Sequence, residues 1–160
     1  MTKNMMDNFA LLLGGNLGDT ERFFDAALIG LAAAGATRLH RSRLYRTAPV
    51  DCVPGTPDFL NCAVTGFFPG SPRELLALTQ HLEIAAGRPA CHSSREARVL
   101  DIDIILFGNT IFATPDLTIP HPRARLRRFV LEPLAEIAPE LSFPDTGETV
   151  AAALARLDER

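Results

Sequence analysis

Apolar and polar residues follow two spacings along the chain, one typical of strands and one typical of helices. Short apolar runs bounded by glycine, proline or polar residues predict buried strands, whereas apolar residues three and four apart predict helices that cover a core. The second helix is the most clearly marked, because Ser71 is a suitable N-cap, Pro72 fits the first helical position and Glu74 completes a capping box. The expected strands are 9–13, 37–45, 59–68, 99–107 and 110–113, and the expected helices are 20–34, 72–87, 129–137 and 149–158.

The order of these elements is strand, helix, strand, strand, helix, strand. It predicts an α+β fold with a ferredoxin-like β-α-β-β-α-β core, a mainly antiparallel sheet with helices packed on one face, and a C-terminal helical extension. We find no repeat and no linker, so residues 1–160 are expected to form a single domain. Segments 47–57 and 88–97 lack periodicity and are expected to be functional loops, and 115–128 is expected to be irregular.

Composition and net charge exclude several classes of protein. Of the 160 residues, 47% are hydrophobic and 22% are charged, as in an ordinary globular domain. A net charge of −3 argues against a nucleic-acid partner bound through bulk positive charge, and no apolar run approaches the roughly 20 residues of a membrane span. Three cysteines without C-x-x-C spacing indicate reduced thiols and a cytoplasmic location.

Charge is distributed unevenly along the chain. Segment 88–128 contains seven arginines and four acids, whereas the chain as a whole is acidic. Because arginine donates hydrogen bonds in a planar fork that matches phosphate, this segment favours an anionic ligand. A second basic cluster within 38–46 is interpreted as a solvated surface.

Two carboxylates stand out in the strongly apolar strand 99–107. Side chains alternate between the two faces of a strand, so Asp101 and Asp103 should point one way and Leu100, Ile102, Ile104 and Leu106 the other. Adjacent carboxylates repel one another, and a divalent cation relieves this repulsion; hard oxygen ligands favour Mg²⁺. From this motif alone, a solvated aspartate pair or a pair neutralised by nearby arginine is the more frequent arrangement.

The surroundings of the aspartates favour phosphoryl transfer. Arginines precede them in 88–98 and follow them in 123–128, and a metal with converging cations is what such chemistry requires. The chain has no G-x-x-x-x-G-K-[ST] phosphate loop, no G-x-S-x-G elbow and no paired-histidine metal motif. The glycine-rich segment 14–18 is interpreted as a tight turn more readily than as a phosphate cradle.

Six segments, taken in order from about Phe9 to Asp145, resemble the family of 6-hydroxymethyl-7,8-dihydropterin pyrophosphokinases of folate biosynthesis. No single segment is specific, but the ordered set is. The segments are Gly14–Asp19, Tyr45–Pro49, Pro57–Asn61, Glu83–Arg88, Arg98–Gly108 and Pro120–His121.

The resemblance implies a role for each site residue. Two Mg²⁺ ions would be held by Asp101 and Asp103, and Arg88 and Arg98 would contact phosphates, these four forming the catalytic set. The ATP site would also include Gln80, Glu83, Ile104, Thr118, His121 and Arg127. The pterin pocket would include Thr47, Pro49, Val50, Phe59, Asn61, Asp101 and Phe129.

The resemblance also implies the reaction. A pyrophosphoryl group would pass from ATP to the hydroxymethyl group of the pterin and release AMP, with both long loops closing over the substrates. The expected partners are these two small molecules, with no nucleic acid and no membrane, and the expected assembly is a monomer or weak homodimer. Phe59 and Phe129 would sandwich the flat ring, although each alone would be interpreted as core packing.

The second loop departs from the family pattern, and this leaves two alternatives open. The chain has Ala90, Ser94, Arg95 and Glu96 where arginine, a basic residue, tryptophan and glycine are usual, and Asp116 stands where arginine is frequent. One alternative is a pterin- or nucleotide-binding module that has lost its chemistry. The other is a phosphotransferase or hydrolase that releases ADP or phosphate.

Overall fold

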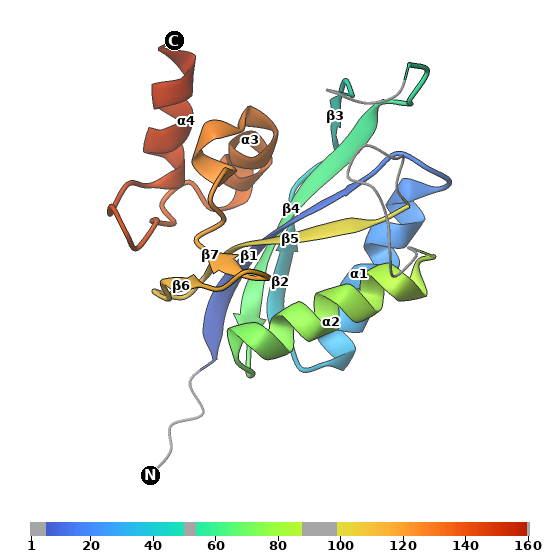
Figure 1. Cartoon of the computed structure of the whole chain (residues 1–160), viewed down its shortest axis with the longest axis horizontal. Helices are drawn as coiled ribbons and strands as arrows, with labels where there is room; N and C mark the ends of the chain where they lie inside the picture. Colours follow the sequence, from blue (N-terminus) through green and yellow to red (C-terminus); the bar gives the residue numbers. More distant parts are fainter. Residues whose placement is uncertain (1–5, 50–53, 88–98, 160) are drawn as a thin grey trace.

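The computed structural model describes residues 6–49, 54–87 and 99–159. Within these ranges an antiparallel sheet of five strands forms the centre of the molecule (Figure 1). The order of hydrogen-bonded neighbours is β2-β4-β1-β5, and the short strand β3 also pairs with β4. The strands are β1 Asp7–Gly15, β2 Thr37–Arg41, β3 Tyr45–Thr47, β4 Phe59–Phe68 and β5 Asp101–Phe107.

Helices cover both faces of this sheet (Figure 1). The helices α1 (Thr20–Ala33) and α2 (Pro72–Ala85) lie on one face, and α3 (Arg128–Ile137) and α4 (Val150–Asp158) lie on the other. The ferredoxin-like core is therefore confirmed, but the expectation of helices on one face holds only for α1 and α2. The C-terminal extension adds a third layer.

Two apolar cores flank the sheet, and β1 contributes to both. Its alternate residues Leu11 and Leu13 pack with α1 and α2, whereas Ala10 and Leu12 pack with α3 and α4. This explains why β1 is a continuous apolar run, since a strand covered on both faces needs no polar side. In α1 the fully buried aromatic residue is Phe24.

The helix termini follow the local sequence closely. Asp19 accepts the backbone N–H of Arg22 at 3.3 Å, and Ser71 accepts that of Glu74 at 3.1 Å. Gly35, which follows α1, has a φ of +100°, a conformation that strongly favours glycine. These residues fix where both helices begin or end, and the predicted helices agree with the structure within about two residues.

The strand expected over 37–45 is interrupted by Ser42. The Ser42 hydroxyl accepts the N–H of Ala63 at 2.9 Å, and so replaces a backbone carbonyl in the ladder with β4. The Ser42 hydroxyl also donates to the Arg43 carbonyl at 2.8 Å. The result is two strands, β2 and β3, that pair in turn with β4.

Strand β5 contains a bulge that alters the predicted alternation. Ala10 pairs with Leu106 but Leu11 pairs with Ile104, so Ile105 is an extra residue in the ladder. Before the bulge, Ile102 and Ile104 face α1 and α2 as predicted. After it, Leu106 joins Ile105 on the α3 and α4 side, so the predicted orientation of Leu106 is wrong.

The segment expected to be irregular, 115–128, contains two short elements. Strand β7 (Thr118–Ile119) pairs with β6 (Phe112–Ala113), and a 3₁₀ turn, η1, covers Ala124–Leu126. No helix in the described part of the chain is long and apolar enough to cross a bilayer.

Candidate active site

The sheet register brings two predicted site residues to either side of one glycine. Gly14 of β1 pairs with Asn61 of β4 on one side and with Asp101 of β5 on the other. A Cβ atom at Gly14 would lie 3.0 Å from the Asn61 Oδ1 atom, so the absence of a side chain leaves room for the amide. One row across the sheet therefore connects a predicted pterin contact with a predicted metal ligand.

The two aspartates lie on the same face of β5, as the alternation predicts. Asp103 pairs with Leu12, which belongs to the core under α3 and α4, and both aspartates are half-buried. Strand β5 is the last strand in the order of the sheet, so its outer edge is available for side chains from other elements.

Glu83 of α2 occupies part of that edge. Its side chain is buried, and its Oε2 atom accepts the backbone N–H of Ile102 at 2.9 Å. This hydrogen bond fixes the strand at the residue between Asp101 and Asp103. The structure thus assigns Glu83 a contact with the protein backbone, whereas its contact with a nucleotide stays a prediction.

His121 is anchored to the same strand by the bulge. Its backbone N–H donates to the carbonyl of Ile105 at 2.9 Å, and its Nδ1 atom accepts the N–H of Arg123 at 3.2 Å. Burial lowers the pKa of His121, and the charges of Arg127 and Arg123 lower it further, while Asp101 acts in the opposite direction. A neutral ring whose Nδ1 accepts must carry its proton on Nε2, so His121 offers a hydrogen-bond donor.

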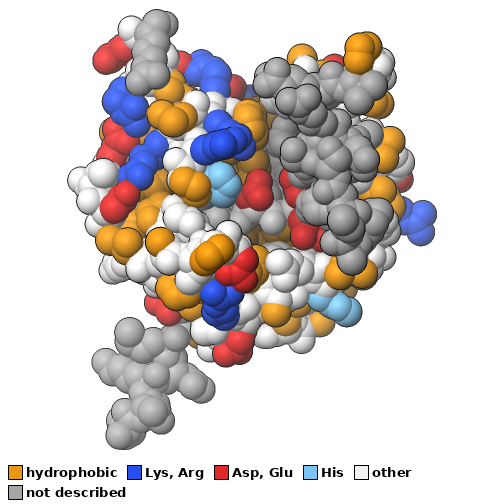
Figure 2. Space-filling view, viewed as in Figure 1, with side chains coloured by type: hydrophobic (Ala, Val, Ile, Leu, Met, Phe, Trp, Pro, Cys, Tyr) orange, Lys and Arg blue, Asp and Glu red, His pale blue; other side chains and the backbone are white. Residues whose placement is uncertain are grey.

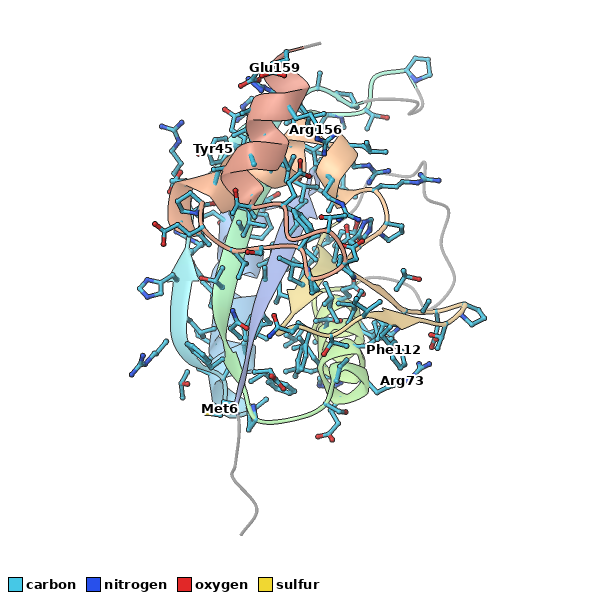
Figure 3. All side chains as sticks on the ribbon, turned by 90° about the vertical axis from the view of Figure 1, so that its left-hand side faces the viewer. Met6, Tyr45, Arg73, Phe112, Arg156 and Glu159 are labelled. Atoms are coloured by element: carbon cyan, nitrogen blue, oxygen red, sulfur yellow. The ribbon has the colours of Figure 1, made fainter. Side chains whose placement is uncertain are left out.

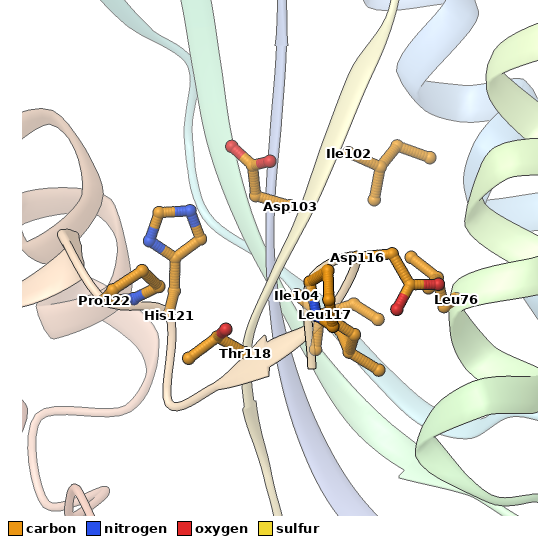
Figure 4. A pocket seen from close by; sticks show the side chains of 10 residues that line it. Leu76, Ile102, Asp103, Ile104, Asp116, Leu117, Thr118, His121 and Pro122 are labelled. Carbon is orange, nitrogen blue, oxygen red and sulfur yellow. The ribbon is translucent and has the colours of Figure 1, made fainter. Parts of the chain in front are cut away.

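A groove of about 260 Å³ lies beside these groups. Figure 4 shows the Asp103 carboxylate and the His121 ring on one side of it, with Thr118 below them on β7. In the space-filling view, basic and acidic side chains gather around a hollow in this face (Figure 2). The lining residues are Leu76, Ile102, Asp103, Ile104, Pro115, Asp116, Leu117, Thr118, His121 and Pro122.

Asp116 in this groove has its own cationic partner. Arg73 of α2 donates to Asp116 at 2.7 Å, and Thr114 donates to the other carboxylate oxygen at 2.8 Å. The guanidinium and the hydroxyl hold the pKa of Asp116 at about 2. Arg73 also lies over the ring of Phe112, 5.5 Å from its centre (Figure 3). The negative charge that Asp116 brings to the groove is therefore offset by Arg73.

The four arginines of 123–128 divide into two pairs. Arg125 forms an ion pair with Asp145 at 2.6 Å, and Arg128 pairs with Asp158, so both tie the segment to the C-terminal part of the chain. Arg123 and Arg127 are the two whose charges act on His121. Arg127 also lies over the ring of Phe129, 5.4 Å from its centre.

The predicted pterin residues converge at the end of β4. Asn61 is buried and donates to the Thr47 hydroxyl at 2.9 Å. Phe59 is two residues away on the same face, and Phe129 packs against the core that covers this face. Asn16 donates to the carbonyl of Pro57 at 3.1 Å and so fixes the entry to β4.

The remaining predicted residues are Pro49, Gln80 and a group outside the described chain. Pro49 is half-buried just after β3, and Gln80 is exposed on α2. The residues outside the described ranges are Val50, Arg88, Ala90, Ser94, Arg95, Glu96 and Arg98.

The aspartate pair suits Mg²⁺ by the chemistry of its donors. Within residues 6–49, 54–87 and 99–159, no group of three or more His, Cys, Asp or Glu side chains is arranged to hold a metal ion. Mg²⁺ in nucleotide enzymes needs only one or two carboxylates, because water and phosphate oxygens complete its octahedron. Two neighbouring carboxylates on one strand face fit that requirement.

Sequence reasoning missed two residues that shape this site. Arg73 bonds to Asp116, which is 43 residues away, and Glu136 bonds to Tyr45, which is 91 residues away. No spacing rule in the sequence could reveal these contacts, since each depends on how the layers pack.

The fold and the site define a class of protein: a ferredoxin-like α+β domain with a small-molecule groove beside paired carboxylates at the sheet edge. A profile of the family described as 7,8-dihydro-6-hydroxymethylpterin-pyrophosphokinase (HPPK) matches residues 10–139. The chain therefore belongs to the HPPK family, and the expectation of a pyrophosphokinase is confirmed at the level of the family.

Named relatives agree with this assignment. A 2-amino-4-hydroxy-6-hydroxymethyldihydropteridine pyrophosphokinase of Bacillus subtilis is 40% identical over 144 residues, covering 85% of this chain and 81% of the relative. The enzyme of the same name from Synechocystis is 36% identical over 147 residues, covering 91% and 74%.

Solved structures confirm the fold. A triple mutant of Plasmodium falciparum HPPK-DHPS superimposes with a TM-score of 0.77 at 17% identity. The alignment covers 99% of this chain and 45% of that one, so this chain spans less than half of the Plasmodium protein.

Proposed function

We propose that this protein transfers pyrophosphate from ATP to the hydroxymethyl group of 6-hydroxymethyl-7,8-dihydropterin, with Mg²⁺, and releases AMP. The observation that carries the proposal is the row Asn61–Gly14–Asp101 across the sheet. It connects the residues proposed to hold the pterin with a groove whose lining includes Asp103, Thr118 and His121. An acceptor alcohol and a nucleotide triphosphate would thus meet at the aspartate pair.

On the pterin side, the chain offers both ring contacts and edge contacts. Phe59 and Phe129 would take the two faces of the heterocycle, since aromatic faces stack favourably in offset arrangements. The Asn61 amide has a donor and an acceptor to match the edge of the ring, and its bond to Thr47 holds it in place. These contacts would orient the hydroxymethyl oxygen toward the β-phosphorus of ATP.

On the nucleotide side, the proposed contacts combine carboxylates, a hydrogen-bond donor and arginines. Asp101 and Asp103 would hold Mg²⁺, which when bound neutralises charge on the transferring group and orients it. His121 would donate through Nε2, and Arg127 would add positive charge next to it. Arg88 and Arg98 are proposed phosphate contacts on the basis of family resemblance alone.

The loops 47–57 and 88–97 are proposed to close over the substrates and to exclude water that would otherwise accept the pyrophosphoryl group. This part of the proposal rests on the resemblance. A cytoplasmic location and a monomer or weak homodimer are likewise proposed from the sequence.

The deciding experiment is nucleotide analysis after mixing the protein with Mg-ATP, with and without the pterin alcohol. We expect AMP only when the pterin is present, together with the pyrophosphorylated pterin. Formation of ADP would instead indicate a phosphotransferase, and ADP or AMP without pterin would indicate a hydrolase. The double variant D101N/D103N should abolish transfer while keeping the fold, and activity that survives it would refute the metal assignment.

A second function, a binding module without chemistry, is favoured by the substitutions Ala90, Ser94, Arg95 and Glu96 in the second loop. It predicts that the pterin raises the melting temperature of the protein without any AMP being formed.

A further inference from the structure

One carboxylate on α3 binds the segment that leads into and forms β3. Glu136 accepts the hydroxyl of Tyr45 at 2.7 Å through Oε1 and the backbone N–H of Arg43 at 3.0 Å through Oε2. The Arg43 guanidinium lies 3.5 Å from Oε1 and 4.8 Å from the centre of the Tyr45 ring. Three groups of one short segment thus converge on a single side chain of another layer.

This cluster connects the two walls of the proposed pterin pocket. Tyr45 pairs in register with Asn61, and Thr47 at the end of the same strand accepts the Asn61 amide. On the other wall, Glu136 is seven residues after Phe129 in α3, which places the two side chains on the same face of the helix. The distance between Phe129 and the Asn61–Thr47 pair therefore depends on the contact between Glu136 and β3.

The strand β3 needs such an anchor because it has few other contacts. It consists of three residues, and within the described chain it pairs only with β4. The cluster lies near the surface, where the Arg43 side chain is 74% exposed and that of Glu136 is 34% exposed. Exposed ion pairs contribute little to folding stability, so its main effect should be on the position of β3 and not on the stability of the whole domain.

We propose that Glu136 is a positioning residue for the pterin substrate, holding β3 and α3 at the separation that admits a flat ring next to Asn61. The proposal rests on the proposed function of the site. It concerns a residue outside the predicted set, whose hydrogen bonds come from Arg43 and Tyr45 and which does not line the groove.

The test compares E136A, E136Q and Y45F with the wild type in steady-state kinetics. We expect the KM for the pterin to rise roughly fivefold in E136A, which removes two hydrogen bonds, and roughly threefold in Y45F, which removes one, with the KM for ATP unchanged. E136Q keeps an acceptor for Tyr45 and should recover part of the loss. An equal rise in both KM values, or none in E136A and Y45F, would overturn the proposal.

Glu148 offers a matched control. It accepts two hydrogen bonds from Arg156, at 2.9 and 3.0 Å, within the C-terminal segment. E148A should lower the melting temperature at least as much as E136A and leave both KM values unchanged. If E148A raises the KM for the pterin as much as E136A does, the effect is a general loss of stability and the proposal is wrong. Because Y45F removes a single oxygen, it serves where E136A does not fold.

Equilibrium binding separates this proposal from the proposed function. Affinity for the pterin alcohol is measured with α,β-methylene-ATP, in which the bond that would break is replaced by a methylene bridge. If the wild type binds the pterin but forms no AMP from ATP, the proposed function fails, and weaker binding by E136A still supports the positioning role. Equal binding by wild type and E136A would overturn it, as would a wild type that does not bind the pterin.

Discussion

The hydrogen bond from Ile102 to Glu83 gives a prediction whose magnitude follows from the structure. The Glu83 side chain is buried and accepts a backbone N–H at 2.9 Å on the strand that carries both aspartates. In E83A this N–H loses its partner, which costs about 1–3 kcal/mol, and the loss of buried methylene groups adds about 1 kcal/mol. We therefore expect E83A to lower the free energy of unfolding by about 2–4 kcal/mol.

This loss leaves the domain folded, because domains of this size are stable by about 5–15 kcal/mol. Each kcal/mol shifts the melting temperature of a domain of this length by about 2–4 °C, so E83A should melt roughly 5–15 °C lower. E83Q keeps a carbonyl oxygen that accepts from Ile102, and it should lose about 1 kcal/mol or less. E140A, a change at an exposed glutamate, should have an effect below about 0.5 kcal/mol.

The assay is thermal and urea unfolding of the three variants and the wild type, followed by AMP formation well below the melting temperature. Because Ile102 lies between Asp101 and Asp103, E83A should also lose activity, and E83Q should retain most of it. If E83Q and E83A are equally unstable, the hydrogen bond to Ile102 is not what Glu83 contributes, and the reasoning is refuted.

Three further predictions test other parts of the structure. Cys62 is fully buried, and burial raises the pKa of its thiol to about 12. In a variant whose other two cysteines are replaced by serine, a disulfide reagent should react with Cys62 only when the protein unfolds. Rapid labelling of the native protein would contradict this. G14A places a Cβ atom 3.0 Å from the Asn61 amide oxygen, and we expect a raised KM for the pterin with little loss of stability, so an unchanged KM would exclude this contact. R127A removes a positive charge near His121, so NMR titration of the metal-free protein should show the pKa of His121 rising toward 6.5. The fold favours the neutral His121 ring, so the contribution of His121 to folding stability is present above pH 6.5 and is lost as pH falls through the pKa of the folded protein. If R127A leaves the pKa of His121 unchanged, the charge of Arg127 does not act on this ring.

Local signals in the sequence predict the elements well. The Ser71-Pro72 start of α2 and the extent of β4 agree with the structure, because caps and apolar alternation act over a few residues. The shared face of Asp101 and Asp103 is predicted for the same reason.

Features that depend on long-range pairing could not be predicted in this way. Apolar alternation in 37–45 gives no sign that Ser42 replaces a backbone acceptor, since that depends on the position of Ala63 on another strand. The alignment of Asn61 with Asp101 depends on the register of three strands, which pattern alone leaves open. Family resemblance supplied the candidate site residues, but their partners, such as Arg73 for Asp116, come from the packing.

The extra residue at Ile105 constrains how the length of this strand can change. Before Ile105, the side chains alternate so that both aspartates share one face of the strand. After it, Leu106 points into the core under α3 and α4, and Phe107 points into the core under α1 and α2. Deleting Ile105 would leave one regular alternation, in which every remaining side chain keeps its layer, but it would remove the carbonyl that accepts the His121 N–H. Substitution at Ile105 by another apolar residue keeps this carbonyl. A variant that lacks Ile105 should therefore fold but lose the anchor of His121, whereas changes of length in the turn at 108–110 should keep it.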